Sequence, residues 1–329
     1  MTRWRGHAAA RAAFRAAMSG GALHHAWLFA GPEGVGKAAF AREAAARLLA
    51  EASGERGTED FGVAAESRTA AMMAAGAHPD YRELRRLPKD PDKPAELARS
   101  IPIAQVRALL PMFATAPAMG ARRVVVIDAI DDVERPGASN ALLKSLEEPP
   151  AGTIFLLISH APGRLLPTIR SRCRLLRFEP LAPDEMRGAL GDALPEASPG
   201  EIDALVRIGG GSPGRALRYA GLDIGGIDDA LAAIARDGDT GNAQRLKLSR
   251  ALAGKASQPR YEAFLERAPS FIADAAPLRH GPELATALDT YAEARDLAAA
   301  ARALSLDPAG TVLEMAGLVA RLHARGAMH

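Results

Sequence analysis

Short apolar runs alternate with amphipathic stretches through the first half of the chain. The apolar runs are typical of strands and span residues 26–30, 81–87, 124–127, 153–159 and 174–178. The stretches between them have helical spacing and span residues 37–50, 103–113, 138–146 and 162–169. Continuous apolar runs indicate strands buried on both faces, and their alternation with helices predicts a parallel sheet covered on both sides. Residues 1–179 are therefore expected to form an α/β domain.

The strand pattern ends at about residue 180. Three short helical segments follow, separated by glycine and proline, at residues 183–193, 199–208 and 213–220. Longer amphipathic helices are expected at residues 227–235, 243–252, 261–274, 283–304 and 309–324. This pattern predicts a small helical domain at residues 180–224 and a helical C-terminal domain at residues 225–329. Residues 51–77 carry no clear pattern, and Pro111 is expected to end the helix at 103–113 early.

A glycine-rich turn lies between the first strand and the helix after it. Its sequence matches a phosphate-binding loop up to the last position of the pattern: Gly31, Pro32, Glu33, Gly34, Val35, Gly36 and Lys37. Glycines let successive backbone N–H groups converge on phosphate oxygens, and the N-terminus of the helix favours negative charge. The lysine of such a loop reaches the β- and γ-phosphates. The loop and its context predict a nucleotide-binding P-loop fold.

Two groups needed for hydrolysis are missing from this pattern. Ala38 stands where Ser or Thr normally holds Mg²⁺ through its hydroxyl, and a methyl group cannot bind a hard cation. Asp128 ends the strand at 124–127 and could hold magnesium through water, but Ala129 follows it instead of a water-activating Glu. Asp131 and Asp132 are expected to point elsewhere. Two interpretations stay open: a nucleotide pocket that has lost catalysis, and a loop kept only for folding.

Composition narrows the class of protein further. The chain has 329 residues, a formal net charge of +2 and one cysteine, Cys173. One cysteine excludes an intramolecular disulfide and a cysteine-cluster metal site, which favours a reducing, cytoplasmic setting. The apolar run at 154–158 is far shorter than the ~20 residues that span a membrane, so we expect a soluble protein. The arginine-rich residues 1–30 run directly into the first strand and are interpreted as part of the fold.

Two later motifs carry a specific resemblance. The first is the segment from Ser139 to Pro150, SNALLKSLEEPP, and the second is Ile169 to Cys173, IRSRC. Together with the loop and Asp128, in this order, they resemble the AAA+ subunits of bacterial DNA polymerase III clamp loaders. In that family the Ser-Arg-Cys motif presents an arginine finger to the ATP of a neighbouring subunit, so the resemblance implies this role in trans for Arg172. Arginine suits it because its charge is permanent and its donors fork around phosphate oxygens.

The same resemblance implies further sites and partners. Ser159 falls at the family's nucleotide-sensing polar residue, and Arg215, in the segment GSPGR, falls at its sensor arginine. The family implies a RecA-like nucleotide domain, a helical lid and a C-terminal collar domain. It also implies a heteropentamer with gamma/tau and delta subunits that acts on the sliding clamp and primed DNA. The ligand would be ATP or ADP, weakly bound or vestigial, and the place of magnesium stays open.

One departure from the family concerns zinc. Many relatives carry a four-cysteine zinc module before a His-Pro-Asp segment, which here is His78 to Asp80. Residues 51–77 contain no cysteine, so no zinc is expected and His78 is interpreted as a turn residue.

Within this family, Ala38 and Ala129 favour a subunit that does not hydrolyse ATP. Whether the chain is an enzyme in its own right stays open, although it would belong to a nucleotidyltransferase holoenzyme. Three alternatives remain: an ATP-hydrolysing subunit of the gamma/tau type, a P-loop kinase, and a structural scaffold without nucleotide.

Overall fold

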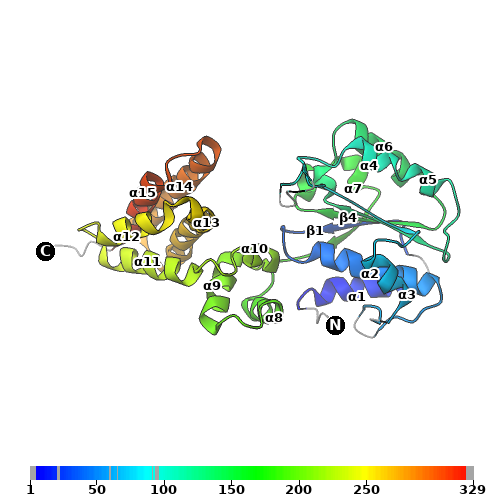
Figure 1. The fold of residues 1–329 in the computed structure, drawn as a ribbon, viewed down its shortest axis with the longest axis horizontal. Coiled ribbons are helices and arrows are strands. Elements are labelled where there is room, and N and C mark those ends of the chain that lie inside the picture. Colours follow the sequence, from blue (N-terminus) through cyan, green and yellow to red (C-terminus); the bar gives the residue numbers. More distant parts are fainter. Residues whose placement is uncertain are drawn as a thin grey trace. The chain divides into compact units, whose positions relative to one another are not determined.

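The protein forms two compact units in a computed structural model, Met1–Ala182 and Pro183–His329 (Figure 1). The structure describes residues 5–20, 23–58, 61–64, 66–90, 92 and 96–323. The boundary between the units lies within a few residues of the predicted end of the α/β domain. The further division expected near residue 224 stays a prediction.

The first unit is built on a five-stranded parallel sheet with the order β2-β3-β4-β1-β5. The strands are β1 (Ala26–Ala30), β2 (Tyr81–Arg85), β3 (Arg123–Asp128), β4 (Thr153–Ser159) and β5 (Arg174–Arg177). Every residue of β1 and β4 is buried, as continuous apolar runs predict. The predicted α/β class with a parallel sheet is confirmed.

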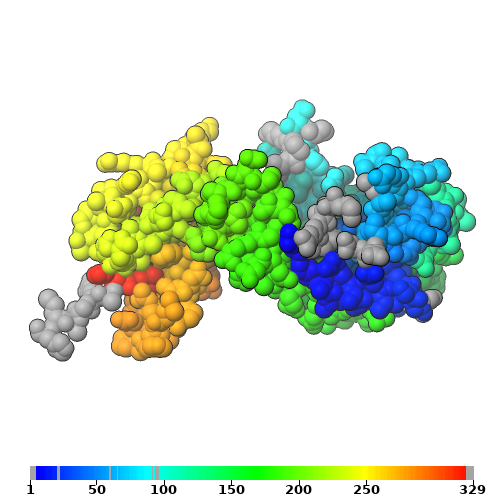
Figure 2. All heavy atoms as spheres, turned by 90° about the horizontal axis from the view of Figure 1, so that it is seen from below, coloured from blue at the N-terminus to red at the C-terminus, as the bar shows by residue number. Residues whose placement is uncertain are grey.

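Alternate residues of the strands enter two separate cores. Trp27, Phe29 and Val126 point to one face, where they pack with Phe14 of the helix α1 (Ala8–Ser19) and Phe40 of α2 (Lys37–Ala52). The residues between them point to the other face, where the helices α4 (Ile103–Arg107), α6 (Gly137–Glu147) and α7 (Pro167–Arg170) close the second core. Helices therefore cover both faces of the sheet, as Figure 1 shows. On the side drawn in Figure 2, the outer surface of α1 (dark blue) is open to solvent.

Seven α-helices of the described residues belong to the first unit. They are α1 (Ala8–Ser19), α2 (Lys37–Ala52), α3 (Arg68–Ala74), α4 (Ile103–Arg107), α5 (Leu110–Phe113), α6 (Gly137–Glu147) and α7 (Pro167–Arg170). The helix predicted at 103–113 is two short helices, α4 and α5. Pro111 lies in the first turn of α5, where its missing N–H costs no helical hydrogen bond.

The poorly patterned residues 51–77 contain the helix α3, which the sequence analysis missed. Its N-cap is Ser67, whose side chain accepts a hydrogen bond from the amide of Ala70. The carboxylate of Glu55 in turn accepts from the hydroxyls of Ser67 and Thr69, each at 2.6 Å. Polar capping rather than an apolar stripe fixes this helix, which explains why hydrophobic periodicity did not reveal it.

The second unit is helical in all its described residues that form regular structure. Its α-helices are α8 (Pro183–Ala193), α9 (Pro199–Gly209), α10 (Pro213–Leu217), α11 (Ile224–Asp237), α12 (Ala243–Leu252), α13 (Gln258–Ala275), α14 (Gly281–Leu304) and α15 (Pro308–Ala320). Three of them start with a capping side chain followed by proline, at Ser198, Ser212 and Asp307. The capping side chain accepts a hydrogen bond from a backbone N–H that has no partner within the helix, and the proline fixes φ at the first helical residue. The sequence therefore predicts where these helices begin.

A buried ion cluster joins three helices of the second unit. Asp228 of α11 accepts from Arg267 of α13 at 2.5 Å and from Arg207 of α9 at 2.7 Å. Arg267 is only 2% exposed and also pairs with Asp274 at 3.0 Å. The buried pair of this cluster is Asp228 with Arg267, which joins α11 to α13, whereas Arg207 of α9 reaches it from a side chain that is 47% exposed.

Candidate functional site

The glycine-rich turn connects β1 with α2 in a conformation that needs its glycines. A Cβ at Gly31 would lie 2.0 Å from the carbonyl oxygen of Phe178, so no other residue fits there. Gly34 and Gly36 have φ values of 79° and 107°, in the region that favours glycine. The turn therefore has the backbone of a tight loop between a strand and a helix N-terminus, as the motif predicts.

Lys37 is the first residue of α2 and closes the loop from inside. Its ammonium donates to the carbonyl oxygen of Gly31 at 2.6 Å and to that of Pro32 at 2.5 Å. Burial lowers its pKa to about 8, although the charges of Asp128, Asp131 and Glu33 act in the opposite direction. Two backbone carbonyl groups thus hold the lysine in the loop. To bind a phosphate, the ammonium would have to exchange these hydrogen bonds for bonds to phosphate oxygens.

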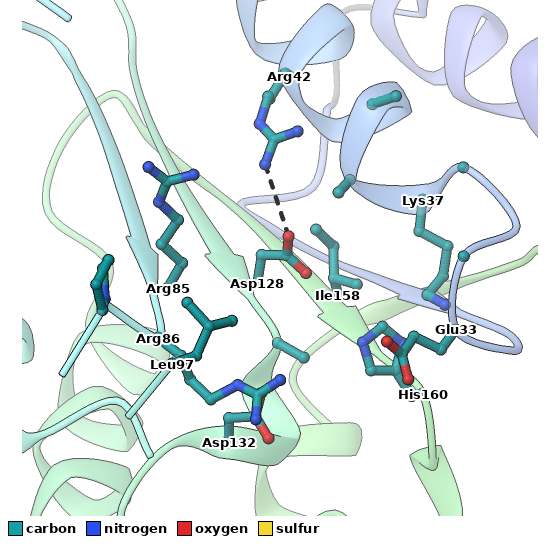
Figure 3. Close-up of a pocket in the computed structure, with 16 residues that line it drawn as sticks. Glu33, Lys37, Arg42, Arg85, Arg86, Leu97, Asp128, Asp132, Ile158 and His160 are labelled. Carbon is teal, nitrogen blue, oxygen red and sulfur yellow. Dashed lines mark ion pairs between the residues drawn. The ribbon is translucent and has the colours of Figure 1, made fainter. Parts of the chain in front are cut away.

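Asp128 ends β3 beside the loop and is paired with a cation of the protein. A guanidinium nitrogen of Arg42 lies 3.7 Å from its carboxylate oxygen (Figure 3). Glu83 binds the same guanidinium at 2.6 Å. Burial raises the pKa of Asp128, with the Arg42 charge acting against this shift. Ala129, the next residue, is a buried methyl group.

The loop and Asp128 supply few ligands for a magnesium ion. Ala38 lines the pocket but offers no oxygen, and the carboxylate of Asp128 already faces a guanidinium. Among the described residues, no group of three or more His, Cys, Asp or Glu side chains is placed to hold a metal. Magnesium beside a nucleotide takes most of its oxygen ligands from phosphates and water, so the clear loss here is the side-chain hydroxyl that Ala38 lacks.

The carboxylates of Asp131 and Asp132, which were expected to point elsewhere, differ in their relation to the pocket: Asp132 lines it, and Asp131 is not among its lining residues. They lie in a 3₁₀ turn, Ile130–Asp132, which returns the chain to the carboxyl edge of the sheet. Asp131 accepts from the hydroxyl of Ser159 at 2.9 Å and from the amide of His160 at 2.6 Å. Asp132 lines the pocket and pairs with Arg86 at 3.0 Å. Both carboxylates therefore have partners within the protein.

The pocket at the loop has a volume of about 600 Å³. Four basic side chains reach it, Lys37, Arg42, Arg85 and Arg86, and three acidic ones, Glu33, Asp128 and Asp132. It also contains Gly34, Gly36, Ala38, Ala39, Pro88, Leu97, Ala129, Ile158 and His160. Figure 3 shows Arg85 and Arg86 on the side of β2, Arg42 extending from α2, and Lys37 on the side of the loop. The arrangement can hold an anion but brings no free carboxylate to activate water.

Sequence reasoning missed Arg42, Arg85, Arg86, Leu97 and His160 as parts of this pocket. A signal existed for three of them. Arg85 and Arg86 are at the carboxyl end of β2 and His160 follows β4, and the carboxyl ends of parallel strands meet at one edge of a sheet. Burial and the Lys37 charge lower the pKa of His160.

Arg172 is not among the residues that line this pocket; it lies between α7 and β5. One guanidinium nitrogen donates to the carbonyl oxygen of Thr168 at 2.9 Å, and another pairs with the carboxylate of Glu147 at 2.7 Å. Its side chain is 33% exposed. Glu147 is the last residue of α6, so the two motifs that carry the family resemblance meet through this ion pair.

The neighbours of Arg172 explain the rest of its motif. The hydroxyl of Ser171 donates to the carbonyl oxygen of Thr168 at 3.2 Å, which closes the turn. Cys173 packs against the core on the α6 side of the sheet, and burial raises the pKa of its thiol to about 12. Serine and cysteine thus fix the backbone on either side of the arginine.

Arg215, the predicted sensor arginine, lies in α10 of the second unit. Ser212 caps that helix, and the guanidinium of Arg215 pairs with Glu266 of α13 at 3.0 Å. Its role toward nucleotide stays a prediction. His78 is a buried turn residue whose Nδ1 accepts from the amide of Asp80 at 3.2 Å.

No helix within the described parts of the chain is both long and apolar enough to cross a bilayer.

Comparisons with known proteins agree with these features. A family model described as "DNA polymerase III, delta subunit" matches residues 6–182. The DNA polymerase III subunit delta' of Pseudomonas aeruginosa is 38% identical over 212 residues, which is 63% of this chain and 59% of that protein. The delta' subunit of Escherichia coli is 34% identical over 203 residues, 61% of this chain and 56% of that protein.

A gamma/tau subunit of DNA polymerase III from Mycobacterium tuberculosis is 33% identical over 67% of this chain and 40% of its own length. The match with the delta' subunits spans somewhat over half of their length. The order of the parallel strands, with the phosphate loop after β1, agrees with the predicted AAA+ P-loop fold class. The chain belongs to the DNA polymerase III delta subunit family.

Proposed function

We propose that this chain is a clamp-loader component of DNA replication, of the delta-prime type, and that it presents Arg172 to the nucleotide of a neighbouring ATPase subunit. The observation that carries this proposal is the geometry of Arg172. Its guanidinium is partly exposed, and its turn is fixed by Ser171 and Cys173. A cation presented in this way can stabilise charge that develops on a transferred phosphoryl group.

The pocket of the chain itself supports a subunit without hydrolysis. Ala38 supplies no metal ligand, Ala129 supplies no base, and Asp131 and Asp132 are engaged by other groups. We propose that ATP or ADP binds there weakly if at all, through Lys37 and the loop, with little need for magnesium. The ATP-hydrolysing gamma/tau type is disfavoured by the same residues, although such subunits are among the relatives.

The partners follow from the proposed role. They are the gamma/tau and delta subunits in a heteropentamer, the sliding clamp, and primed DNA reached through the complex. A replication subunit of this kind would act in the cytoplasm.

The test uses a clamp loader reconstituted from this chain and the other subunits of the same organism. Arg172→Ala should leave assembly intact but reduce turnover at one ATPase site, because fingers of this type are worth ~10³ or more in rate. Total ATP hydrolysis should then fall in part, and clamp loading should fall further. Wild-type loading by an assembled Arg172→Ala complex would refute the proposal.

Arg170→Ala is the matched control. Arg170 is exposed and close in sequence, but it is outside the motif position, so its variant should behave as the wild type. Arg174 is a poorer control, because its guanidinium lies 5.2 Å from the centre of the Trp27 ring and its removal loses that contact.

A further inference from the structure

The ion pair between Arg172 and Glu147 joins two elements that are both anchored in the core. Leu142 and Leu146 anchor α6, and Ile169 anchors α7. All three side chains are buried in the same apolar cluster. The guanidinium is therefore held from two sides, by the carboxylate of Glu147 and by the carbonyl oxygen of Thr168. Glu147 belongs to α6 and Thr168 to α7, and both helices pack against this core.

The stability of α6 does not explain a glutamate at this position. Glu147 is the last residue of the helix and Glu148 follows it. The C-terminus of a helix carries partial negative charge, so acidic side chains are unfavourable there. The positive charge of Arg172 offsets this unfavourable effect for Glu147. The carboxylate is therefore stabilised by its contact with Arg172 and not by its own helix.

Binding by Glu147 leaves the guanidinium able to act. An arginine carries five N–H donors in a fixed fork. One bond to Thr168 and one to Glu147 fix its orientation and leave further donors for phosphate oxygens. A long side chain on a turn would otherwise sample many rotamers, and ordering it in advance lowers the cost of placing it at a transition state.

We propose that Glu147 is the positioning residue of the arginine finger. This positioning role rests on the function proposed above, in which Arg172 acts on the nucleotide of a neighbouring subunit. The carboxylate orients the guanidinium and does not itself touch the nucleotide. Its removal should therefore act only through Arg172.

The experiment is a double-mutant cycle in the reconstituted clamp loader. Complexes with Glu147→Ala, Arg172→Ala and both changes are compared for assembly, for kcat and KM of ATP hydrolysis, and for clamp loading. Exposed ion pairs contribute little, so Glu147→Ala should reduce clamp loading by about 2- to 5-fold, less than Arg172→Ala does. The effect should fall on kcat with KM unchanged, and the double variant should equal Arg172→Ala alone.

Two further variants separate positioning from a general structural role. Glu147→Gln keeps an acceptor without the charge, so it should recover part of the loading that Glu147→Ala loses. Glu148→Ala removes a neighbouring carboxylate that does not bind Arg172 in this structure, and it should load clamps as the wild type does.

Each outcome decides the proposal. A Glu147→Ala effect that disappears when Arg172 is absent supports it. An effect that persists without Arg172, no effect while Arg172→Ala impairs loading, or faster hydrolysis would overturn it and leave the finger role standing. If Arg172→Ala itself loads clamps normally, the finger role fails and the positioning role falls with it.

Discussion

Removing the carboxylate of Asp228 should destabilise the second unit strongly. Asp228 is the shared acceptor of Arg267 and Arg207, which come from two different helices. Asp228→Ala leaves the buried guanidinium of Arg267 without its nearest partner. Because solvent reaches Arg267 poorly, the uncompensated charge dominates the effect.

The magnitude follows from the partners that remain. Breaking a buried pair costs about 3–5 kcal/mol, because one charge is left without compensation. Arg267 keeps Asp274 at 3.0 Å, and Arg207, which is 47% exposed, can turn to solvent. We therefore expect the low end of the range, about 3 kcal/mol. Asp228→Asn keeps an acceptor and should cost less.

Chemical denaturation of the isolated chain measures this effect. Far-ultraviolet circular dichroism follows the helices of both units. Both tryptophans of the sequence, Trp4 and Trp27, belong to residues 1–182, so their fluorescence follows the first unit alone. A shift seen only by circular dichroism therefore reports the second unit. The helical transition of Asp228→Ala should move to lower denaturant. Asp229→Ala is the matched control, since Asp229 is the exposed neighbour and its removal should stay within about 0.5 kcal/mol of the wild type. Equal stability of the Asp228→Ala and Asp229→Ala variants would refute the reasoning.

Three other predictions concern the pocket and metals. The purified chain, with or without DNA, should show no ATP turnover approaching about 1 s⁻¹, because Ala38 and Ala129 supply neither metal ligand nor base; turnover at that rate would disprove the assignment. Nucleotide affinity, measured by titrating fluorescent ATP, should fall as the pH rises through about 8, because Lys37 then loses the positive charge that attracts an anion. The Lys37→Ala variant should bind nucleotide more weakly, and its affinity should not change over this pH range. Equal affinity of the wild type and Lys37→Ala would indicate a loop kept for folding. Elemental analysis should find no stoichiometric zinc, and one tightly held zinc per chain would contradict the cysteine argument.

Apolar patterning predicted the elements of this fold closely. The strands at 26–30 and 153–159 and the helix at 243–252 have the predicted bounds. The two strands are buried along their whole length, and the helix buries Leu248 and Leu252, so each segment carries the apolar pattern that periodicity detects. The helix α3 was missed because its stability comes from Ser67 and Glu55, whose polar bonds leave no periodic trace.

The site could be predicted only as far as local motifs reach. The loop, Asp128 and Arg172 were identified because their chemistry depends on neighbours in sequence. The pairs Arg42 with Glu83 and Arg172 with Glu147 join residues far apart along the chain. Such pairs depend on the order of the strands and on side-chain rotamers, which one sequence does not determine. The bonds of Asp131 to Ser159 and His160 belong to the same class, because they join the turn after β3 to the end of β4.

The single thiol of this protein has a practical consequence for experiments on the assembled machine. Cys173 is the only cysteine in the sequence, and burial raises its pKa to about 12. Alkylating dyes react with thiolates, and at neutral pH this thiol is almost entirely protonated. A second cysteine introduced at an exposed site such as Leu278, which is 84% exposed, would therefore take up a maleimide fluorophore selectively. The burial of Cys173 thus favours labelling at the introduced site over the natural one.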